Sequence, residues 1–307
     1  MSRSLKVISV ASVAGMFLVL LMGALVTKSG SAEGCGASWP TCDGRFLPAA
    51  NIHSVIEYSH RLVSGLTGIA VLAMAIGVWR KYPGRRDLRY LMWTALAFIV
   101  IQSLLGAAAV LWPQPKTVLA LHFGISLTAF AAVLLPMIIM FQIERGATYR
   151  GDPVSSRLRT WIWISIVYVY AVVYSGAYVR HTNSHLACLD WPLCGGALIP
   201  DLSGAVGIQF FHRLAAGVAF LLLVGLAVLA RKERERRPDL YRGAFVAAAL
   251  VTAQVLSGAW VILSHLTLAS MMVHSAIITS LFGALSYLCL QVTREPGQSV
   301  AASGFGA

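Results

Sequence analysis

Long runs of apolar residues alternate with short polar segments along the whole chain. Each run reaches about 20 residues, the length that a helix needs to cross a hydrocarbon core of roughly 30 Å. The pattern therefore predicts an all-α integral membrane protein with eight transmembrane helices. We expect these helices at residues 5–27, 54–79, 90–111, 117–143, 160–179, 206–230, 243–264 and 268–292.

Composition and charge agree with this class of protein. Hydrophobic residues make up 58% of the chain and charged residues only 12%, against about 25% charged residues in soluble domains. The net charge of +12 could indicate nucleic-acid binding, but the basic residues concentrate in the predicted loops near 80–89, 145–159 and 231–242. The positive-inside rule places such loops in the cytoplasm. We expect a multi-pass protein of the lipid bilayer of the cell membrane, with both termini cytoplasmic and no nucleic-acid partner.

Several polar and small residues recur 152 positions later, which indicates an internal repeat. Four helices return a chain to its starting side, so the two halves should share one orientation and be related by an axis along the membrane normal. We expect two tandem pseudo-symmetric four-helix bundles, at residues 1–148 and 149–307. The matching pairs are His60 and His212, Arg61 and Arg213, Gly65 and Gly217, Gln102 and Gln254, Gly106 and Gly258, and His122 and His274.

The four repeated histidines lie at membrane depth, where a polar side chain is costly and usually faces the bundle interior or a functional site. His60 and His122 fall in the second and fourth helices of the first half, and His212 and His274 in those of the second. A lone histidine could simply form a hydrogen bond across helices, and structural zinc would need four closed ligands. Two facing imidazoles in a four-helix core can instead supply both axial ligands of haem iron. The repeated spacing favours one such haem site in each half.

Charged residues next to the histidines add candidate chemistry. Arg61 and Arg213 lie near the outer interface, where a guanidinium can bind a haem propionate or extend to a lipid phosphate. Glu57 is the one acidic residue within a predicted span and lies one helical turn from His60. Gln209 occupies the matching position of the second half. Desolvation should favour a neutral carboxyl, which suits proton exchange; the alternatives are a residue that only orients the histidine and a hydrogen-bonded acid with no chemical role.

Four cysteines form two pairs in the predicted outer loops, Cys35 with Cys42 and Cys188 with Cys194. An extracytoplasmic compartment permits disulfides. We interpret the second pair as a structural link within its loop. For the first pair a structural and a redox-active role stay equally open. Metal binding by all four sulfurs lacks the short spacing of zinc sites.

With these motifs the chain resembles the haem A synthases, in their bacterial form with cysteines in the outer loops. The resemblance implies an oxidoreductase that oxidises the C8 methyl group of haem O to the formyl group of haem A for terminal oxidase assembly. It covers essentially the whole chain and rests on Gly23-Ala24-Leu25-Val26-Thr27, Gly34-Cys35-Gly36, Trp39-Pro40, Cys42, Glu57-Tyr58-Ser59-His60-Arg61, Leu121-His122-Phe123-Gly124, Gly176-Ala177-Tyr178-Val179-Arg180, Cys188, His212-Arg213 and His274.

The resemblance also implies roles for the site residues and their partners. His60 and His122 would hold the substrate haem O, whereas His212 and His274 would bind the iron of a permanent haem b. Glu57 would assist proton chemistry at the substrate, and the first cysteine pair would form a disulfide that can take part in electron transfer. Haem O synthase, the farnesyl transferase that makes the substrate, and an unidentified electron acceptor would be the partners.

Two other classes of protein compete with this interpretation. A bis-histidine cytochrome b that only transfers electrons explains the four histidines equally well, although a symmetric relay does not need Glu57 in one half alone. A haem or solute transporter would also contain paired repeats. Few polar residues line a central path in this sequence, which disfavours the transporter.

Overall fold

The computed structural model describes residues 1–112, 116–146 and 153–293. Across these residues it contains eight helices that are long and apolar enough to span a membrane, which confirms the prediction. Two short 3-10 helices, η1 (Ser184–Leu186) and η2 (Arg231–Glu233), follow α5 and α6. The long helices are α1 (Arg3–Lys28), α2 (Ile52–Lys81), α3 (Arg86–Leu111), α4 (Lys116–Glu144), α5 (Ser156–His181), α6 (Gly204–Ala230), α7 (Pro238–Leu263) and α8 (Leu268–Thr293).

Several helices begin before the predicted spans, because polar side chains cap them. The side chain of Asn51 accepts a hydrogen bond from the backbone N–H of Ser54 at 2.9 Å, so α2 already begins at Ile52. Ser155 caps α5 in the same way. The histidine of α2 therefore lies further into its helix than the hydrophobic boundary implied.

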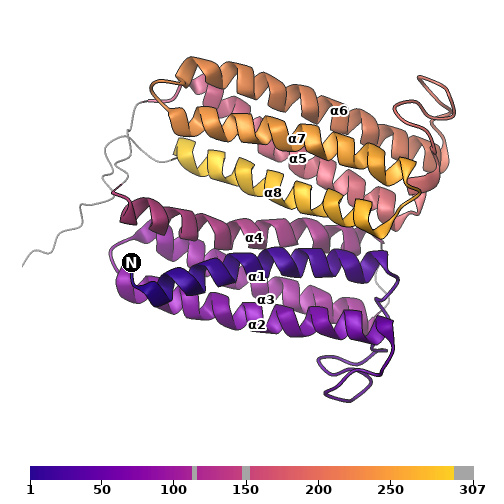
Figure 1. The fold of residues 1–307 in the computed structure, drawn as a ribbon, viewed down its shortest axis with the longest axis horizontal. Coiled ribbons are helices and arrows are strands. Elements are labelled where there is room, and N and C mark those ends of the chain that lie inside the picture. Colours follow the sequence, from indigo (N-terminus) through magenta and orange to yellow (C-terminus); the bar gives the residue numbers. More distant parts are fainter. Residues whose placement is uncertain (113–115, 147–152, 294–307) are drawn as a thin grey trace, which may run out of the picture.

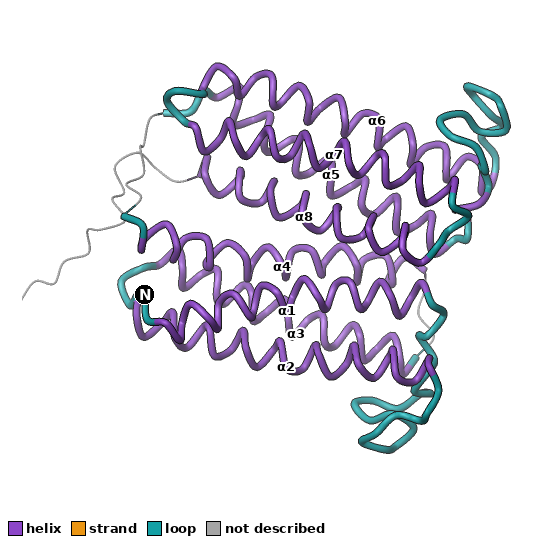
Figure 2. The backbone as a smooth tube through the Cα atoms, in the orientation of Figure 1, coloured by secondary structure: helices purple, strands orange, loops and turns teal. Residues whose placement is uncertain are grey.

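The helices form two groups of four that lie side by side, α1 to α4 and α5 to α8 (Figure 1). Helices α1 and α4 of the first group contact α5 and α8 of the second. The long α1–α2 and α5–α6 loops project from the same end of the molecule (Figure 2), and the N-terminus lies at the other end. This layout is the one expected of two tandem bundles. The predicted boundary at residue 148 lies outside the described residues.

Polar contacts join the two groups near the loop end. The Nζ atom of Lys28, at the end of α1, donates to the carbonyl oxygen of Met271 and to Oγ of Ser275 on α8, both at 2.5 Å. Arg180 of α5 donates to the carbonyl oxygen of Thr27 at 3.1 Å. These contacts hold the outer ends of the two groups together around the space that contains the histidines.

Candidate functional site

All four predicted histidines line one cavity between the helices. The cavity has a volume of about 2020 Å³, and residues of all eight long helices contribute to its walls. Ordinary small-molecule pockets measure roughly 300–1,000 Å³, so this cavity has room for more than one large planar ligand. The structure thus brings His60, His122, His212 and His274 to a common space, with Glu57 at its edge.

A glycine on the preceding helix faces each imidazole ring. Without a side chain, the glycine lets the ring lie directly against the helix backbone. This packing places all four rings in the same manner. The pairs, with the distance from a Cβ atom built on the glycine to Cε1 of the ring, are Gly23 and His60 (3.3 Å), Gly106 and His122 (3.9 Å), Gly176 and His212 (2.8 Å), and Gly258 and His274 (3.4 Å).

In the second half, the residue before each of these glycines is a serine that contacts the histidine. Oγ of Ser175 lies 2.7 Å from Nδ1 of His212, and Oγ of Ser257 lies 2.9 Å from Nδ1 of His274. A hydrogen bond at one ring nitrogen fixes the ring's orientation and leaves the other nitrogen for a metal. The two rings of the second half are therefore oriented by their own neighbours.

The first half lacks these hydroxyl groups. Met22 and Leu105 precede the corresponding glycines. The Nδ1 atoms of His60 and His122 are buried and have no hydrogen-bond partner among the residues that the structure describes. The first-half rings are therefore held less firmly than the second-half rings. This difference was not predicted, although the residue before each glycine carries the signal in the sequence.

A glutamine lies beside each fourth-helix histidine, but the two amides point differently. Nε2 of Gln254 lies 3.0 Å from Nε2 of His274, whereas Nε2 of Gln102 donates to the backbone carbonyl of His122 at 2.9 Å. Iron coordination by His274 through Nε2 would require the Gln254 amide to turn away. Otherwise the two imidazoles in each half, the apolar walls and the ring-facing glycines fit a haem held by two histidines.

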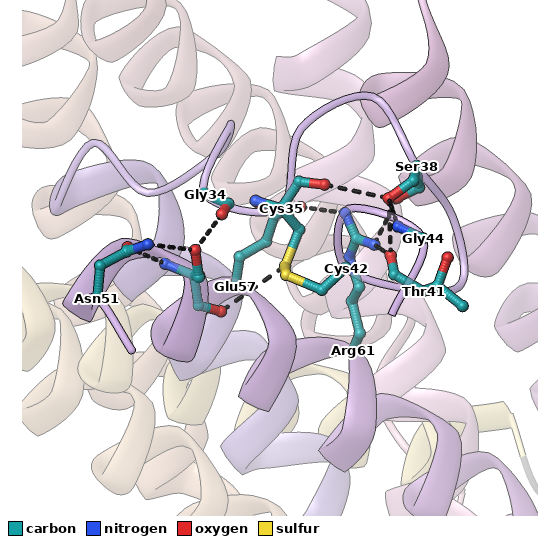
Figure 3. Close-up of a disulfide and its surroundings, with 10 residues drawn as sticks. Gly34, Cys35, Ser38, Thr41, Cys42, Gly44, Asn51, Glu57 and Arg61 are labelled. Atoms are coloured by element: carbon teal, nitrogen blue, oxygen red, sulfur yellow. Dashed lines mark hydrogen bonds and ion pairs between the residues drawn. A yellow bond between two sulfur atoms is a disulfide. The ribbon is translucent and has the colours of Figure 1, made fainter. Parts of the chain in front are cut away.

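Glu57 lies beneath the first disulfide loop (Figure 3). Its Oε2 atom accepts a hydrogen bond from the backbone N–H of Cys35 at 2.9 Å, and Oε1 forms an ion pair with Arg61, one turn further along α2. The side chain is buried. The ion pair was not predicted; it forms because the guanidinium four residues along the helix reaches the same carboxyl group.

Gln209 takes the matching place beneath the second loop. Its Oε1 atom accepts from the backbone N–H of Cys188 at 2.6 Å, and its Nε2 atom donates to the carbonyl oxygen of His185 at 3.0 Å. Gln209 and Glu57 therefore tie their helices to the first cysteine of a loop in the same way. They differ in charge, since the glutamate brings a carboxylate to the cavity.

The two predicted arginines also hold these loops. Arg61 donates to the carbonyl oxygens of Ser38 at 2.7 Å and Thr41 at 2.6 Å. Arg213 donates to the carbonyl oxygen of Leu193 at 2.6 Å and to that of the first cysteine in its loop at 2.8 Å. Both arginines line the cavity. A guanidinium has five N–H groups, so contact with a propionate would use those that the loop carbonyls leave free.

Each of the two outer loops is closed by a disulfide, Cys35–Cys42 in the first and Cys188–Cys194 in the second. This confirms the predicted pairing. All four cysteines are buried. In the second loop the carboxylate of Asp190 accepts hydrogen bonds from two glycine N–H groups at 2.8 and 2.9 Å, and these bonds lower the pKa of Asp190.

The chain is similar over its whole length to proteins of one family. Residues 6–286 match the COX15-CtaA family model, described as cytochrome oxidase assembly protein. A protein named heme A synthase from Symbiobacterium thermophilum is 47% identical over 300 residues, which cover 95% of this chain and 98% of that protein. The heme A synthases of Geobacillus kaustophilus and Alkalihalophilus pseudofirmus are 42% and 41% identical. These matches cover 100% and 96% of this chain, and 97% and 99% of the two relatives.

Proposed function

The chain belongs to the COX15-CtaA family of cytochrome oxidase assembly proteins, and from this premise we propose that it is a haem A synthase. It is a membrane oxidoreductase that converts haem O into haem A. The full-length similarity to heme A synthases carries this conclusion. In the reaction a methyl group and one water molecule yield a formyl group, and four electrons and four protons leave.

We propose that the two halves, residues 1–148 and 149–307, are pseudo-symmetric bundles that bind different haems. His60 and His122 would hold haem O as the substrate, and His212 and His274 would bind the iron of a resident haem b. The serine contacts support this assignment, because a permanent group benefits from ligands that stay oriented, whereas a substrate must exchange. When bound, haem b would supply a one-electron relay for electrons that leave the substrate.

Glu57 is the proposed proton acceptor at the substrate. It is a buried carboxylate on the cavity wall, one turn from the substrate ligand His60. Accepting a proton would weaken the ion pair of Glu57 with Arg61. Because Arg61 also holds the first disulfide loop, proton uptake would affect that loop. The N–H groups of Arg61 and Arg213 that the loop carbonyls leave free would bind haem propionates.

The charge of the loops and the chemistry of the reaction indicate the orientation of the enzyme and its partners. The basic loops support a cytoplasmic location for both termini by the positive-inside rule. Haem O synthase, the farnesyl transferase that makes the substrate, is the proposed partner upstream. An electron acceptor outside the chain must take the electrons. The disulfide between Cys35 and Cys42 either relays them or only closes its loop.

The experiment that tests the function is pigment analysis of the purified full-length protein, loaded with haem b and supplied with haem O and an electron acceptor. Extracted pigments are identified by mass. The proposal expects haem A to accumulate at the expense of haem O. Unchanged haem O beside stable haem b would overturn it and would favour an electron-transfer cytochrome b.

Glu57→Gln tests the proton role separately. Gln209 already holds its loop in the second half, so we expect the variant to keep its fold, its disulfide and its bound haems. Formyl formation should fall by about a hundredfold or more, the usual contribution of a general base. The matched control is Gln209→Glu, which should leave formyl formation unchanged. Wild-type turnover in Glu57→Gln would reject the proton role.

A further inference from the structure

Helices α2 and α3 contact each other at mid-helix, where Gly68 lies near Ile99, and toward their cytoplasmic ends. There the rings of Trp79 and Trp93 lie with their centroids 4.7 Å apart, and α3 contributes the buried residues Leu88, Met92 and Ala95. Further out, within the described stretch of α3 from Ala95 to Ala107, no intervening residue is buried. The outer half of α3 is therefore sparsely covered by protein.

The large cavity extends into this region. At 100° per residue, Gly65, Leu66 and Ile69 lie on the side of α2 opposite His60, yet they line the same cavity. Leu66 and Ile69 are 59% and 67% exposed. Across from them, Ser103 of α3 also lines the cavity and is exposed. The cavity thus passes from the histidines, between the outer halves of α2 and α3, to the membrane-facing surface.

The opening is apolar and has little obstruction. Leu62, Leu66, Ile69 and Ile99 contribute apolar side chains to it. No described protein atom lies within 4 Å of a Cβ atom built on Gly65. Packing against neighbouring protein therefore does not explain this glycine. Inside a helix, glycine is less stable than alanine by about 1 kcal/mol. A glycine at this position keeps the passage wide.

The second half is more closed along the matching helix. The stretch of α7 that corresponds to the uncovered part of α3 includes the buried residues Val251 and Ser257. The matching residues of α6, Gly217 and Leu221, line the cavity too, so the difference in cover between the halves lies along α7 alone. The burial of Val251 is independent of the serine contacts at the histidines.

We propose that haem O enters the first half sideways from the membrane, through the opening between α2 and α3, and that haem A leaves by the same route. This inference rests on the proposed function. Haem O carries a farnesyl chain, which is a lipid-soluble group that belongs in the bilayer and matches the apolar rim. The chain stays between α2 and α3 while the porphyrin reaches the histidine pair. Substrate and product therefore never cross an aqueous phase.

The test replaces Ser103 with tryptophan, which fills the opening from α3. The full-length, haem b-loaded protein is reconstituted in lipid and mixed with vesicles that contain haem O, and bound haem O is measured over time. We expect Ser103→Trp to slow capture about tenfold or more. Release from preloaded protein into acceptor vesicles should slow by a similar factor. A mere loss of affinity would accelerate release instead.

The matched control is Leu104→Trp, the same change one residue along α3. Leu104 is 64% exposed and does not line the cavity, so its capture rate should stay within about twofold of wild type. Wild-type capture by Ser103→Trp would overturn the proposed route. If that variant loses the haem b spectrum, Leu66→Trp is judged by the same criteria. Capture requires no conversion, so a protein that binds haem O through this opening but forms no haem A contradicts only the proposed function.

Discussion

A hydroxyl group one position before a glycine decides how firmly an imidazole is held in this cavity. Ser175 and Ser257 bond to Nδ1 of the second-half histidines. Methionine and leucine take the corresponding places in the first half. Partners of this kind around a metal ligand usually change metal affinity by 10- to 100-fold. Two single-residue differences can therefore separate a resident haem from an exchangeable one.

Ser175→Ala should weaken the retention of haem b by about 10- to 100-fold. The substitution leaves His212 in place but removes the hydrogen bond that orients its ring. The measurement is the rate at which a haem-scavenging protein removes haem b from the purified variant. His274→Ala deletes a proposed ligand and is the reference for complete loss of the low-spin haem b spectrum.

Ser165→Ala is the control for this experiment. Ser165 lies on the same helix, and among the described residues its hydroxyl bonds only to the carbonyl of Trp161, so its loss should leave haem b retention unchanged. Equal retention in Ser175→Ala and wild type would show that the hydroxyl does not orient an iron ligand.

At the scale of helices, the ring-facing glycines set how closely neighbouring helices approach. A Cβ atom at Gly176 would lie 2.8 Å from the ring of His212, which real Cβ contacts essentially never show. The ring would have to move, and with it the hydrogen bond to Ser175. At Gly258 the corresponding distance to His274 is 3.4 Å, which is ordinary van der Waals contact.

Gly176→Ala should therefore displace the His212 ring and reduce the low-spin fraction of haem b, whereas Gly258→Ala should change it little. Both variants add one methyl group to the same half, so the comparison isolates the geometry. Absorbance and electron paramagnetic resonance spectra of the oxidised proteins report the fraction. A larger loss in Gly258→Ala would contradict the packing described here.

The transmembrane helices could be predicted from the sequence, because the bilayer sets the length of the apolar runs and the charge of the loops. The eight spans and both disulfides are confirmed. The ion pair of Glu57 was not foreseen, since apolar surroundings suggested a neutral acid before the position of the Arg61 side chain was known. The contact of Ser175 was not foreseen because Ser175 follows Met22 by 153 positions, whereas Ser257 follows Leu105 by 152. That shift hides the pair from a comparison at one fixed offset.

The sequence also could not predict which helices lie between the two groups. Helices α3 and α4 are equally apolar, yet 56% of the apolar window of α4 is buried and only 6% of that of α3. Within a bilayer, lipid tails are as apolar as the side chains, so hydrophobicity does not drive one helix against another. Close packing decides instead, as where Gly124 of α4 lies against the ring of Tyr174 on α5.

At the scale of the molecule, the two groups of helices meet through α1, α4, α5 and α8. Lys28 is the most direct polar link between them, since its amino group reaches α8. The same lysine lies on the wall of the shared cavity. One side chain thus both links the two groups of helices and lines the cavity that contains both candidate haem sites.

Lys28→Met should keep the length of the side chain but lose both hydrogen bonds to α8. Hydrogen bonds to charged groups contribute about 1.5–3 kcal/mol, so the thermal midpoint of the detergent-solubilised protein should fall by several degrees. The control is Lys81→Met, at an exposed position at the cytoplasmic end of α2, which should leave the midpoint unchanged. An unaltered midpoint in Lys28→Met would show that this link adds nothing to the stability of the assembly.

The missing hydroxyl groups around the first-half imidazoles also bear on repeated turnover. The formyl product keeps the iron and the axial positions of its precursor, so any ligand pair that gripped the precursor tightly would grip the product equally and cause product inhibition. On the proposed assignment, rings without a fixed partner at Nδ1 would bind the spent porphyrin more weakly. An active site with looser ligands can therefore be vacated and reused, so that a few enzyme molecules can supply many oxidases.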